Sequence, residues 1–497
     1  MERGFAERFL ESERTLWATG ALIFLLFLTT NLPWQLDDYD QAKQAFTSYQ
    51  LVREGDWLYQ RLPLESVAQK PPLVGWMAAV LYEVIRRWDL AWRLPSLLSA
   101  IAISILLLRA GSSAYGPVAR LISFSAFGLN LLSVRLATLV TTDMPLALSI
   151  ILLGLLIWQK IRTGQPWHWR DRWCMFVLLT ASMFIKGPIG CAFLLPGIVV
   201  FNWCAHKSKF TSAWSGWWPW IGSSALFLLW VGGGILFKPG FYSQVVVREF
   251  LARFSETVHR PQPIYFYLPH LLHKFAPWSV LMIVLAIALG RQTPGRVREK
   301  VRNLPHDILW LTCWSLGSLV VMSVVPSKRV DRIFPVIPSL CLLLGAQVAR
   351  GLAIGRLRQQ VLQCSTVALL FSFVFAGGYT LWKVVPGFRN HRDALVTFSH
   401  AVRQEAAAHQ WRYEVVSAKD ATGTEGMLLY LQKLHFLPLI EAVRKWNSGD
   451  IDALVIPNNQ VDAAMAALHQ ANISSLKVSR RERTEGPGYV LVTRSPG

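Results

Sequence analysis

The stretch VTTDMPLALSIILLGLLIW, residues 140–158, contains a single charged residue, Asp143. An α-helix of about 20 predominantly apolar residues crosses the hydrocarbon core of a bilayer. Similar runs recur along the chain, of whose 497 residues 53% are hydrophobic and only 16% are charged. A soluble protein carries about 25% charged residues. The sequence therefore predicts an all-α polytopic membrane protein.

The apolar runs predict about 11–13 transmembrane helices. The runs that we assign cover residues 16–32, 94–110, 116–133, 140–158, 173–188, 190–204, 217–236, 271–290, 307–325, 333–350 and 361–382. The first run follows Arg3, Arg8 and Arg14. A signal peptide is the alternative, but no small-residue cleavage site follows, so we interpret the run as an uncleaved anchor.

The segment PPLVGWMAAVLYEVI, residues 71–85, is apolar but short, and it contains Glu83. If it lies in the membrane interface, the main basic loops fall on the side of the N-terminus, as the positive-inside rule requires. Those loops cover residues 160–172, 206–209, 291–302 and 350–358. The outer side then receives loops 33–93, 134–139, 237–270 and 326–332, together with the C-terminal tail.

The C-terminal tail changes character, because strand-like runs alternate with helix-like stretches such as residues 462–472. The strand-like runs are YEVVSA at 413–418, DALVIP at 452–457 and GYVLVT at 488–493. We therefore expect two domains. They are a transmembrane domain over residues 1–385, with juxtamembrane helices in loop 33–93 and a long outer loop at 237–270, and a small outer α/β domain over 386–497.

The formal net charge of +20 does not indicate a nucleic-acid partner, because no recognition motif or basic soluble domain accompanies it. Basic loops on the inner side of a membrane protein explain this charge, and membrane lipids are the expected surroundings. The six cysteines show neither metal-ligand nor redox spacing.

Two acids stand beside apolar segments on the predicted outer side. Asp40 opens an amphipathic helix that ends near Gly55, and Asp143 lies in the first turn of a span. Each acid taken alone could serve only as a helix cap or as a partner of the helix dipole. Asp37 and Asp38 precede Asp40 and are alternatives to it.

Basic residues gather on the same predicted side. Lys70 precedes a Pro-Pro pair that stiffens the chain, and Lys186 ends a span. Snorkelling to the interface is the alternative for each lysine alone. Two outer loops contribute the rest, with Arg248, Arg253, His259, Arg260, Tyr265 and Tyr267 in one and Lys328, Arg329, Asp331 and Arg332 in the other.

Basic residues in outer loops run against the positive-inside rule, so they call for another explanation. Fixed Lys and Arg side chains stabilise the negative charge that grows on a phosphate leaving group. A carboxylate can orient an acceptor hydroxyl and remove its proton. The pattern therefore indicates a reaction on an anionic, phosphate-bearing substrate at the outer face.

The run DQAKQAFTSYQLVREGDW at 40–57, followed by QKPPLVGWM at 69–77, resembles the first periplasmic loop of a known enzyme family. The family is that of GT-C fold glycosyltransferases of the aminoarabinose transferase (lipid A modifying) and protein O-mannosyltransferase type. The resemblance continues through TTDMPLAL, FIKGPIG, HRPQPIYFYLP and SKRVDRIFPVIPSL, over about residues 15–350. It implies a GT-C fold and inverting transfer of a sugar from a polyprenyl (undecaprenyl) phosphate carrier, with no metal or other cofactor required.

By this resemblance Asp40 looks like the principal catalytic acid and Asp143 like the second. Lys70 and Arg253 look like the ligands of the carrier phosphate. The other residues expected to bind the substrate are Lys186, His259, Tyr265, Lys328 and Arg332.

The chain departs from the family at three positions. Gln41 follows Asp40 where relatives usually have Glu, and Gln69 stands where the aminoarabinose enzymes have a Glu similar to a zinc ligand. Arg332 stands where those enzymes show Tyr, which weakens the case for aminoarabinose as the sugar.

The functional hypothesis is a glycosyltransferase of the bacterial inner membrane whose active site and C-terminal domain face the periplasm. The acceptor is expected to be a lipid A-like glycolipid, a polysaccharide or a protein, as in a protein O-mannosyltransferase. A transporter or flippase for a lipid-linked sugar is the alternative, although such a protein would show broken helices or repeats with charges at the midplane. A docking protein would explain the α/β tail but not the outer charges.

Overall fold

The computed structural model describes residues 4–31, 35–36, 39–63, 66–205, 213–251, 261–292, 299, 301, 303–389, 393–417, 425–478 and 488–494. It divides into two compact units. Unit 1 comprises residues 1–31, 69–74 and 93–383, and unit 2 comprises residues 32–68, 75–92 and 384–497.

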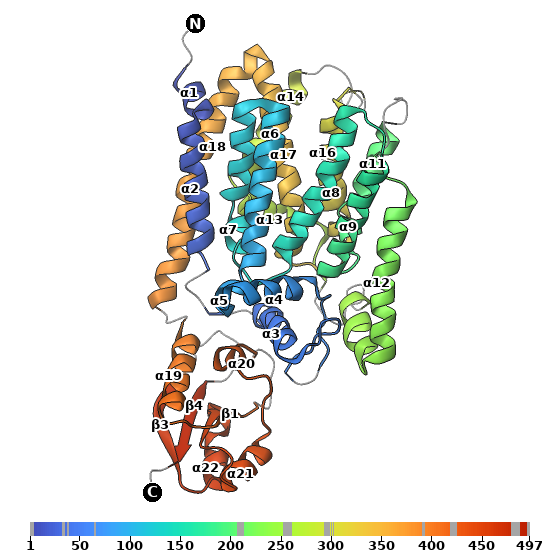
Figure 1. The fold of residues 1–497 in the computed structure, drawn as a ribbon. Helices are drawn as coiled ribbons and strands as arrows, with labels where there is room; N and C mark the ends of the chain where they lie inside the picture. The colour runs from blue at the N-terminus through green and yellow to red at the C-terminus, as the bar shows by residue number, and fades with distance from the viewer. Residues whose placement is uncertain are drawn as a thin grey trace. The chain divides into compact units, whose positions relative to one another are not determined.

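Unit 1 is a bundle of helices (Figure 1). Its helices begin with α1 (Phe5–Glu11), α2 (Glu13–Thr29), α6 (Leu94–Gly128), α7 (Leu131–Leu136), α8 (Asp143–Thr163), α9 (Trp169–Lys186), α10 (Ile189–Ala192), α11 (Leu195–Cys204) and α12 (Trp217–Phe237). They continue with η1 (Tyr242–Leu251), η2 (Ile264–Phe266), α13 (Tyr267–Lys274), α14 (Trp278–Gln292), α16 (His306–Val324), η3 (Val330–Val336), α17 (Ile337–Ala353) and α18 (Gly355–Arg389), which runs on into unit 2.

Six helices among the described residues are long and apolar enough to cross a membrane, or up to eight if each bent pair counts as one span. Eleven runs were expected. Each expected run has a helical counterpart, but Gly116 (φ +87°) and Pro117 break α6, which covers the run at 94–110 and most of the run at 116–133. Residues 169–204 likewise form one bent pair, with an angle of 115° between its halves.

The segment at 71–85 forms helix α4 (Leu73–Ile85), which is only 13 residues long. At 1.5 Å per residue such a helix reaches about 20 Å, short of the roughly 30 Å of the hydrocarbon core. Its length is therefore consistent with the predicted interfacial placement.

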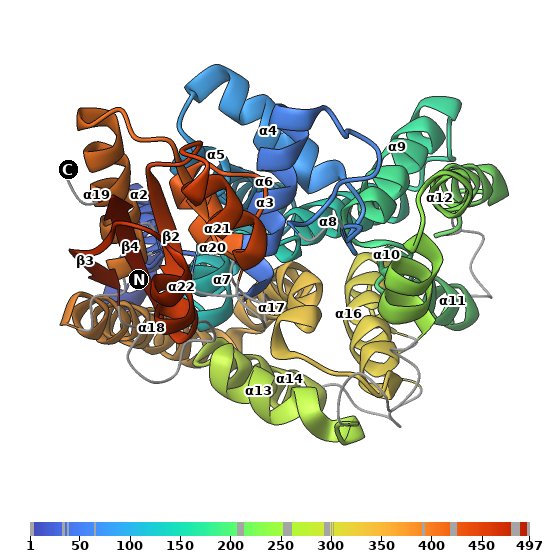
Figure 2. The same ribbon diagram turned by 90° about the horizontal axis from the view of Figure 1, so that it is seen from below.

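The core of unit 1 depends on close approach between helices. α6 packs against α17, α9 against α12, and α11 against α16 (Figures 1 and 2). A Cβ atom built on Gly197 of α11 would lie 2.6 Å from the Cα of Trp314 in α16. Small residues permit such approach in membranes, where apolar burial does not drive helices together. Gly197 thus allows the two backbones to meet.

Unit 2 combines short helices with a small mixed sheet. Its elements are α3 (Tyr39–Glu54), α4, α5 (Trp88–Ala91), α19 (Ala394–Ala408), β1 (Tyr413–Val415), α20 (Glu425–Leu431), α21 (Leu439–Asn447), β2 (Ala453–Pro457), η4 (Asn458–Gln460), α22 (Val461–Ala467), β3 (Ala471–Val478) and β4 (Tyr489–Arg494). The strand order is β1-β2-β4-β3. β1 pairs parallel to β2, and the other pairs are antiparallel. The mostly helical, multi-span architecture with a small mixed sheet confirms the predicted fold class.

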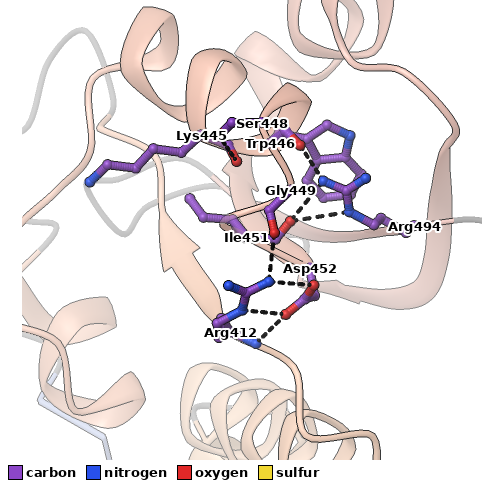
Figure 3. A network of polar contacts seen from close by, with 8 residues as sticks. All are labelled: Arg412, Lys445, Trp446, Ser448, Gly449, Ile451, Asp452 and Arg494. Carbon is purple, nitrogen blue, oxygen red and sulfur yellow. Dashed lines mark hydrogen bonds and ion pairs between the residues drawn. The ribbon is translucent and has the colours of Figure 1, made fainter.

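Arginines tie the sheet to its neighbouring turns (Figure 3). The Nε of Arg412 donates to Asp452 Oδ2 at 3.0 Å, and its Nη2 donates to the Gly449 carbonyl at 2.6 Å. The side-chain hydrogen bond from Arg412 to Asp452 lowers the pKa of the Asp452 carboxyl. Arg494 stacks on Trp446, with its Cζ 4.9 Å from the ring centroid. The charges of this network are thus engaged in holding the fold together.

Candidate functional site

An ion pair joins α8 to α9 inside unit 1. Asp143 is the first residue of α8, Lys186 is the last of α9, and the two helices pack together. Lys186 donates a hydrogen bond to Asp143, and each side chain is only 10% exposed. Burying a charged side chain is strongly unfavourable unless an opposite charge pairs with it. The structure therefore unites two residues that lie 43 positions apart in the sequence.

Buried hydroxyls accompany this pair. Among the described residues, the hydroxyls of Thr141, Thr142 and Ser182 have no hydrogen-bond partner. Thr141 and Thr142 immediately precede Asp143, and Ser182 lies one helical turn before Lys186. Buried polar groups normally have partners. These hydroxyls are thus buried polar groups without a hydrogen-bond partner that accompany the ion pair in the sequence.

Lys328 and Arg332 lie in the segment that leads into and includes η3, which packs against α8. Lys328 is buried, and its Nζ donates to the Gln262 carbonyl at 2.8 Å. Burial lowers the pKa of its ammonium group. Arg332 donates to the carbonyl and the hydroxyl of Ser327, at 2.6 and 2.9 Å. Both cations are thus held by hydrogen bonds to oxygen atoms of the chain.

Tyr265 lines a different feature, an apolar groove between the η2–α13 segment and the end of α16. The groove has a volume of about 230 Å³, and Ser323 is its one polar lining residue apart from Tyr265. Its lining residues are Ile264, Tyr265, Leu268, Leu319, Val320, Ser323 and Val324. Tyr265 is 69% exposed. Such a surface can bind a hydrocarbon chain better than a phosphate.

Asp40 lies in the first turn of α3, within unit 2, and is half-buried. The apolar face of α3 includes the fully buried Ala45, Phe46 and Tyr49. The helix ends at Glu54, and Gly55 follows with φ +81°, a conformation that favours glycine. The predicted limits of this helix are therefore correct.

A polar network fixes the C-terminal end of α3. The buried Gln50 amide donates to Glu54 Oε2 at 2.8 Å and to Asp56 Oδ2 at 3.2 Å, and its oxygen accepts from the Arg61 N–H. His435 Nε2 lies 2.9 Å from Glu54 Oε1, so the C-terminal part of unit 2 reaches the same end of the helix.

The C-terminal part also holds the segment just before α3. The Tyr430 hydroxyl accepts a hydrogen bond of 2.9 Å from the Leu36 N–H, and the Gln35 side chain accepts one of 3.0 Å from the Leu395 N–H. Helix α20, which carries Tyr430, packs along α3. The setting of Asp40 therefore depends on residues nearly 400 positions away in the sequence.

Replacing Tyr430 by phenylalanine is expected to loosen α3. The buried Leu36 N–H would lose its partner, at a cost of about 1–3 kcal/mol. Hydrogen–deuterium exchange should then accelerate in peptides covering residues 39–54. Tyr413→Phe is the matched control, because it removes a partly buried hydroxyl hydrogen bond of 2.7 Å to the Leu431 carbonyl in the same unit. Equal exchange of α3 in both variants would contradict this anchoring role.

The structure describes only some of the remaining residues that were predicted to belong to the site. Lys70 is half-buried in unit 1, just before Pro71 and α4. Arg253 and His259, as well as the alternatives Asp37 and Asp38, lie outside the described residues. Their predicted roles remain predictions.

Sequence reasoning missed a second charged cluster in unit 1. Arg135 Nη1 lies 3.6 Å from Asp331 Oδ1, and Arg329 Nη2 lies 3.8 Å from Asp331 Oδ2. Arg135 belongs to a loop predicted to be outside, where a basic residue is unusual. The unusual position of Arg135 could be recognised in the sequence. Its meaning depends on its ion-pair partner Asp331, which lies almost 200 residues further along the chain.

The comparisons with known proteins support the fold. No family model and no curated protein matches the chain. The crystal structure of ArnT from Cupriavidus metallidurans bound to undecaprenyl phosphate is similar, with a TM-score of 0.68 and 18% sequence identity over 97% of this chain and 99% of that chain. The apo structure of the same protein gives a TM-score of 0.61 and 19% identity, over 97% of this chain and 98% of that chain.

Similarity over nearly the full length of both chains shows that this chain has the GT-C fold of ArnT. The predicted fold is thus confirmed, and the protein is a multi-pass membrane protein.

Proposed function

We propose that the protein is a glycosyltransferase of the bacterial inner membrane that transfers a sugar from a polyprenyl phosphate carrier at the periplasmic face. The observation that carries this proposal is the buried Asp143–Lys186 pair and its free hydroxyl neighbours, in a fold otherwise seen with bound undecaprenyl phosphate in ArnT. A fold alone does not determine a function, so the chemistry of the site has to supply the rest.

In the proposed reaction an acceptor hydroxyl attacks the anomeric carbon of the sugar from the face opposite the carrier. The bond between that carbon and the phosphate oxygen breaks, and the carrier phosphate leaves with the electron pair. Asp40 accepts the proton of the hydroxyl, which makes the oxygen a better nucleophile. Asp143, held in place by Lys186, binds sugar hydroxyls and fixes the orientation of the ring.

Positively charged side chains stabilise the negative charge that develops on the leaving phosphate. Lys70 and Arg253 are the proposed ligands of the carrier phosphate, and Lys328 and Arg332 add positive charge. His259 is proposed as a further substrate contact. The proposal assigns no metal and no other cofactor, because cationic side chains can neutralise the charge that develops on the leaving group.

The apolar groove beside Tyr265 is the proposed site for the isoprenoid chain of the carrier. Its lining is almost wholly hydrocarbon, and its exposed apolar side chains suit a lipid rather than water. Tyr265 brings a phenolic hydroxyl to the rim, as is common where an apolar group meets a polar interface.

A lipid A-like glycolipid is the proposed acceptor, and a polysaccharide or a protein hydroxyl is the alternative. The resemblance of the first outer loop to aminoarabinose transferases favours the glycolipid. Arg332, which stands where those enzymes show Tyr, weakens the case for aminoarabinose as the sugar.

A flippase for a lipid-linked sugar is the competing function, and detergent micelles distinguish it from a transferase. In micelles no compartments exist, so a flippase has nothing to transport. A transferase incubated with a panel of undecaprenyl phosphate sugars and membrane-extracted acceptors should still release free undecaprenyl phosphate. Release only from sealed vesicles, or movement of the intact donor across them, would instead support transport.

A further inference from the structure

Helices α9 and α12 begin side by side at one end of unit 1 (Figures 1 and 2). Near these starts, the ring centroids of Trp173 and Trp218 lie 4.9 Å apart. The other end of α9 holds the Asp143–Lys186 pair, and the 18 residues of this helix span about 27 Å at 1.5 Å per residue. The starts of the two helices therefore lie far from the site proposed for sugar transfer.

Exposed tryptophans mark this end of the two helices. Trp217 and Trp218 begin α12 and are 70% and 37% exposed, and Trp173 of α9 is 49% exposed. Helix α12 is among those long and apolar enough to cross a membrane. Indole rings are amphipathic and gather at the depth of the lipid headgroups. The three tryptophans therefore indicate that this end of unit 1 lies at a bilayer surface.

Arg172 of α9 lies against the chain that enters α12. A Cβ atom built on Gly216, the residue before α12, would lie 3.8 Å from both the Cζ and the Nε of Arg172. The arginine is partly buried, and its Nε has no hydrogen-bond partner among the described residues. With those residues Arg172 forms no ion pair either. Its guanidinium group is thus held beside backbone rather than beside an acid.

The nearby acid does not compensate the charge of Arg172. Asp171 Oδ2 lies 2.5 Å from Lys160 Nζ and accepts a hydrogen bond of 2.9 Å from the His168 N–H. The first turn of α12 contains no acid, and no described side chain caps it. The helix dipole adds partial positive charge at that point. Because charges at the edge of a membrane normally have a partner, this position favours an anion from outside the described part of the chain.

Membrane lipids supply the anion that is present at headgroup depth. A guanidinium group presents its N–H donors in a planar fork that matches two oxygens of a phosphate. A headgroup with a net negative charge, such as that of phosphatidylglycerol, neutralises the arginine. The zwitterionic headgroup of phosphatidylethanolamine brings an ammonium group of its own, which opposes binding beside a cation. Basic positions between transmembrane helices are known sites for anionic headgroups.

We propose that Arg172 binds the phosphate of an anionic glycerophospholipid, with Trp173, Trp217 and Trp218 packing against the glycerol and the first part of the acyl chains. The bound lipid fixes the starts of α9 and α12 at the bilayer surface. This site shares no residue with those proposed to act on the sugar donor or the acceptor. The inference goes beyond the proposed function and does not depend on it.

The test is direct lipid binding, which requires neither a sugar donor nor an acceptor. Delipidated full-length protein in micelles of a neutral detergent is titrated with phosphatidylglycerol or with phosphatidylethanolamine of the same acyl chains. Native mass spectrometry then reports the affinity for the first bound lipid. The wild type should bind phosphatidylglycerol about 10-fold more tightly, because only this headgroup neutralises the guanidinium group. Equal affinities for the two lipids would overturn the proposal.

Arg172→Gln should remove this preference by weakening phosphatidylglycerol binding about 10-fold, with little change for phosphatidylethanolamine. Arg170→Gln is the matched control, because it removes the same charge from the same turn of α9 but from another face, where Arg170 lies 5.6 Å from the Trp169 ring centroid. It should keep the preference. Unchanged preference in Arg172→Gln would contradict the site, and equal losses in both variants would show that net charge alone attracts the lipid.

A measurement on the wild type alone keeps the test independent of how well Arg172→Gln folds. Hydrogen–deuterium exchange is compared between nanodiscs of phosphatidylglycerol and nanodiscs of phosphatidylethanolamine. The first N–H groups of a helix have no partner within it, so a bound headgroup should slow their exchange. Peptides covering residues 213–222 should therefore exchange more slowly with phosphatidylglycerol, whereas α22 should exchange equally in both. Equal exchange of residues 213–222 in the two lipids would overturn the proposal.

Discussion

Asp40→Asn is expected to reduce kcat for sugar transfer by about 10²- to 10⁴-fold, because the acceptor hydroxyl loses its base. Asparagine keeps nearly the same volume, so helix α3 should persist. The measurement is the rate of carrier release at saturating donor, together with direct binding of the donor. Donor binding should remain close to that of the wild type, which separates a chemical defect from a binding defect.

The matched control for this variant is Asp462→Asn, which changes an exposed acid in the first turn of α22 of the same unit. Its kcat should equal that of the wild type. An Asp40→Asn protein that keeps its full rate would remove Asp40 from the mechanism. Attention would then shift to Asp37, Asp38 or Asp143.

Lys186→Met is expected to destabilise unit 1 by about 3–5 kcal/mol, since it leaves the Asp143 carboxylate buried without its cation. Thermal unfolding followed by tryptophan fluorescence should show a clearly lower midpoint. The double variant Asp143→Asn/Lys186→Met should recover much of the stability but not the activity, because the buried charge is gone and the sugar-binding carboxylate with it.

The opposite ends of α8 and α9 provide a control for Lys186→Met. Lys160 lies 2.5 Å from Asp171, with the two side chains 8% and 21% exposed. Lys160→Met should therefore also lower stability, whereas the rate per folded molecule should remain that of the wild type. If both variants lost activity to the same extent per folded molecule, the Asp143–Lys186 pair would have a structural role only.

Much of the fold follows from local sequence. Apolar runs predicted the helical segments, because the length of a span is set by the thickness of the bilayer. The break at Gly116 and Pro117 coincides with the predicted start of the run at 116–133, and the end of α3 near Gly55 was expected. These features depend on residues that are close in sequence.

Other features could not be predicted from residues that are close in sequence. The predicted helix at 462–472 ends at Ala467, and β3 begins at Ala471, because pairing with β4 outweighs the local helical pattern. Similarly, Asp143 and Lys186 were each singled out, but their pairing depends on the packing of α8 on α9.

The site illustrates the same limit. Asp40 was identified from its loop, but its anchors Tyr430 and His435 come from the C-terminal part of unit 2. Arg135 and Asp331 were both visible in outer loops, and only the fold shows that they meet. Tertiary packing determines such contacts, so they could not be predicted from the single sequence.

The most direct test of the central claim uses an undecaprenyl phosphate sugar labelled separately in its sugar and in its lipid, with purified protein in micelles and a glycolipid acceptor. The proposed reaction predicts that the two labels separate in equal amounts, with the sugar label in the acceptor lipid and the lipid label in free undecaprenyl phosphate. Separation should be lost in Asp40→Asn. Labels that stay together in the wild type with every sugar and acceptor offered, or that separate equally in Asp40→Asn, would contradict the account.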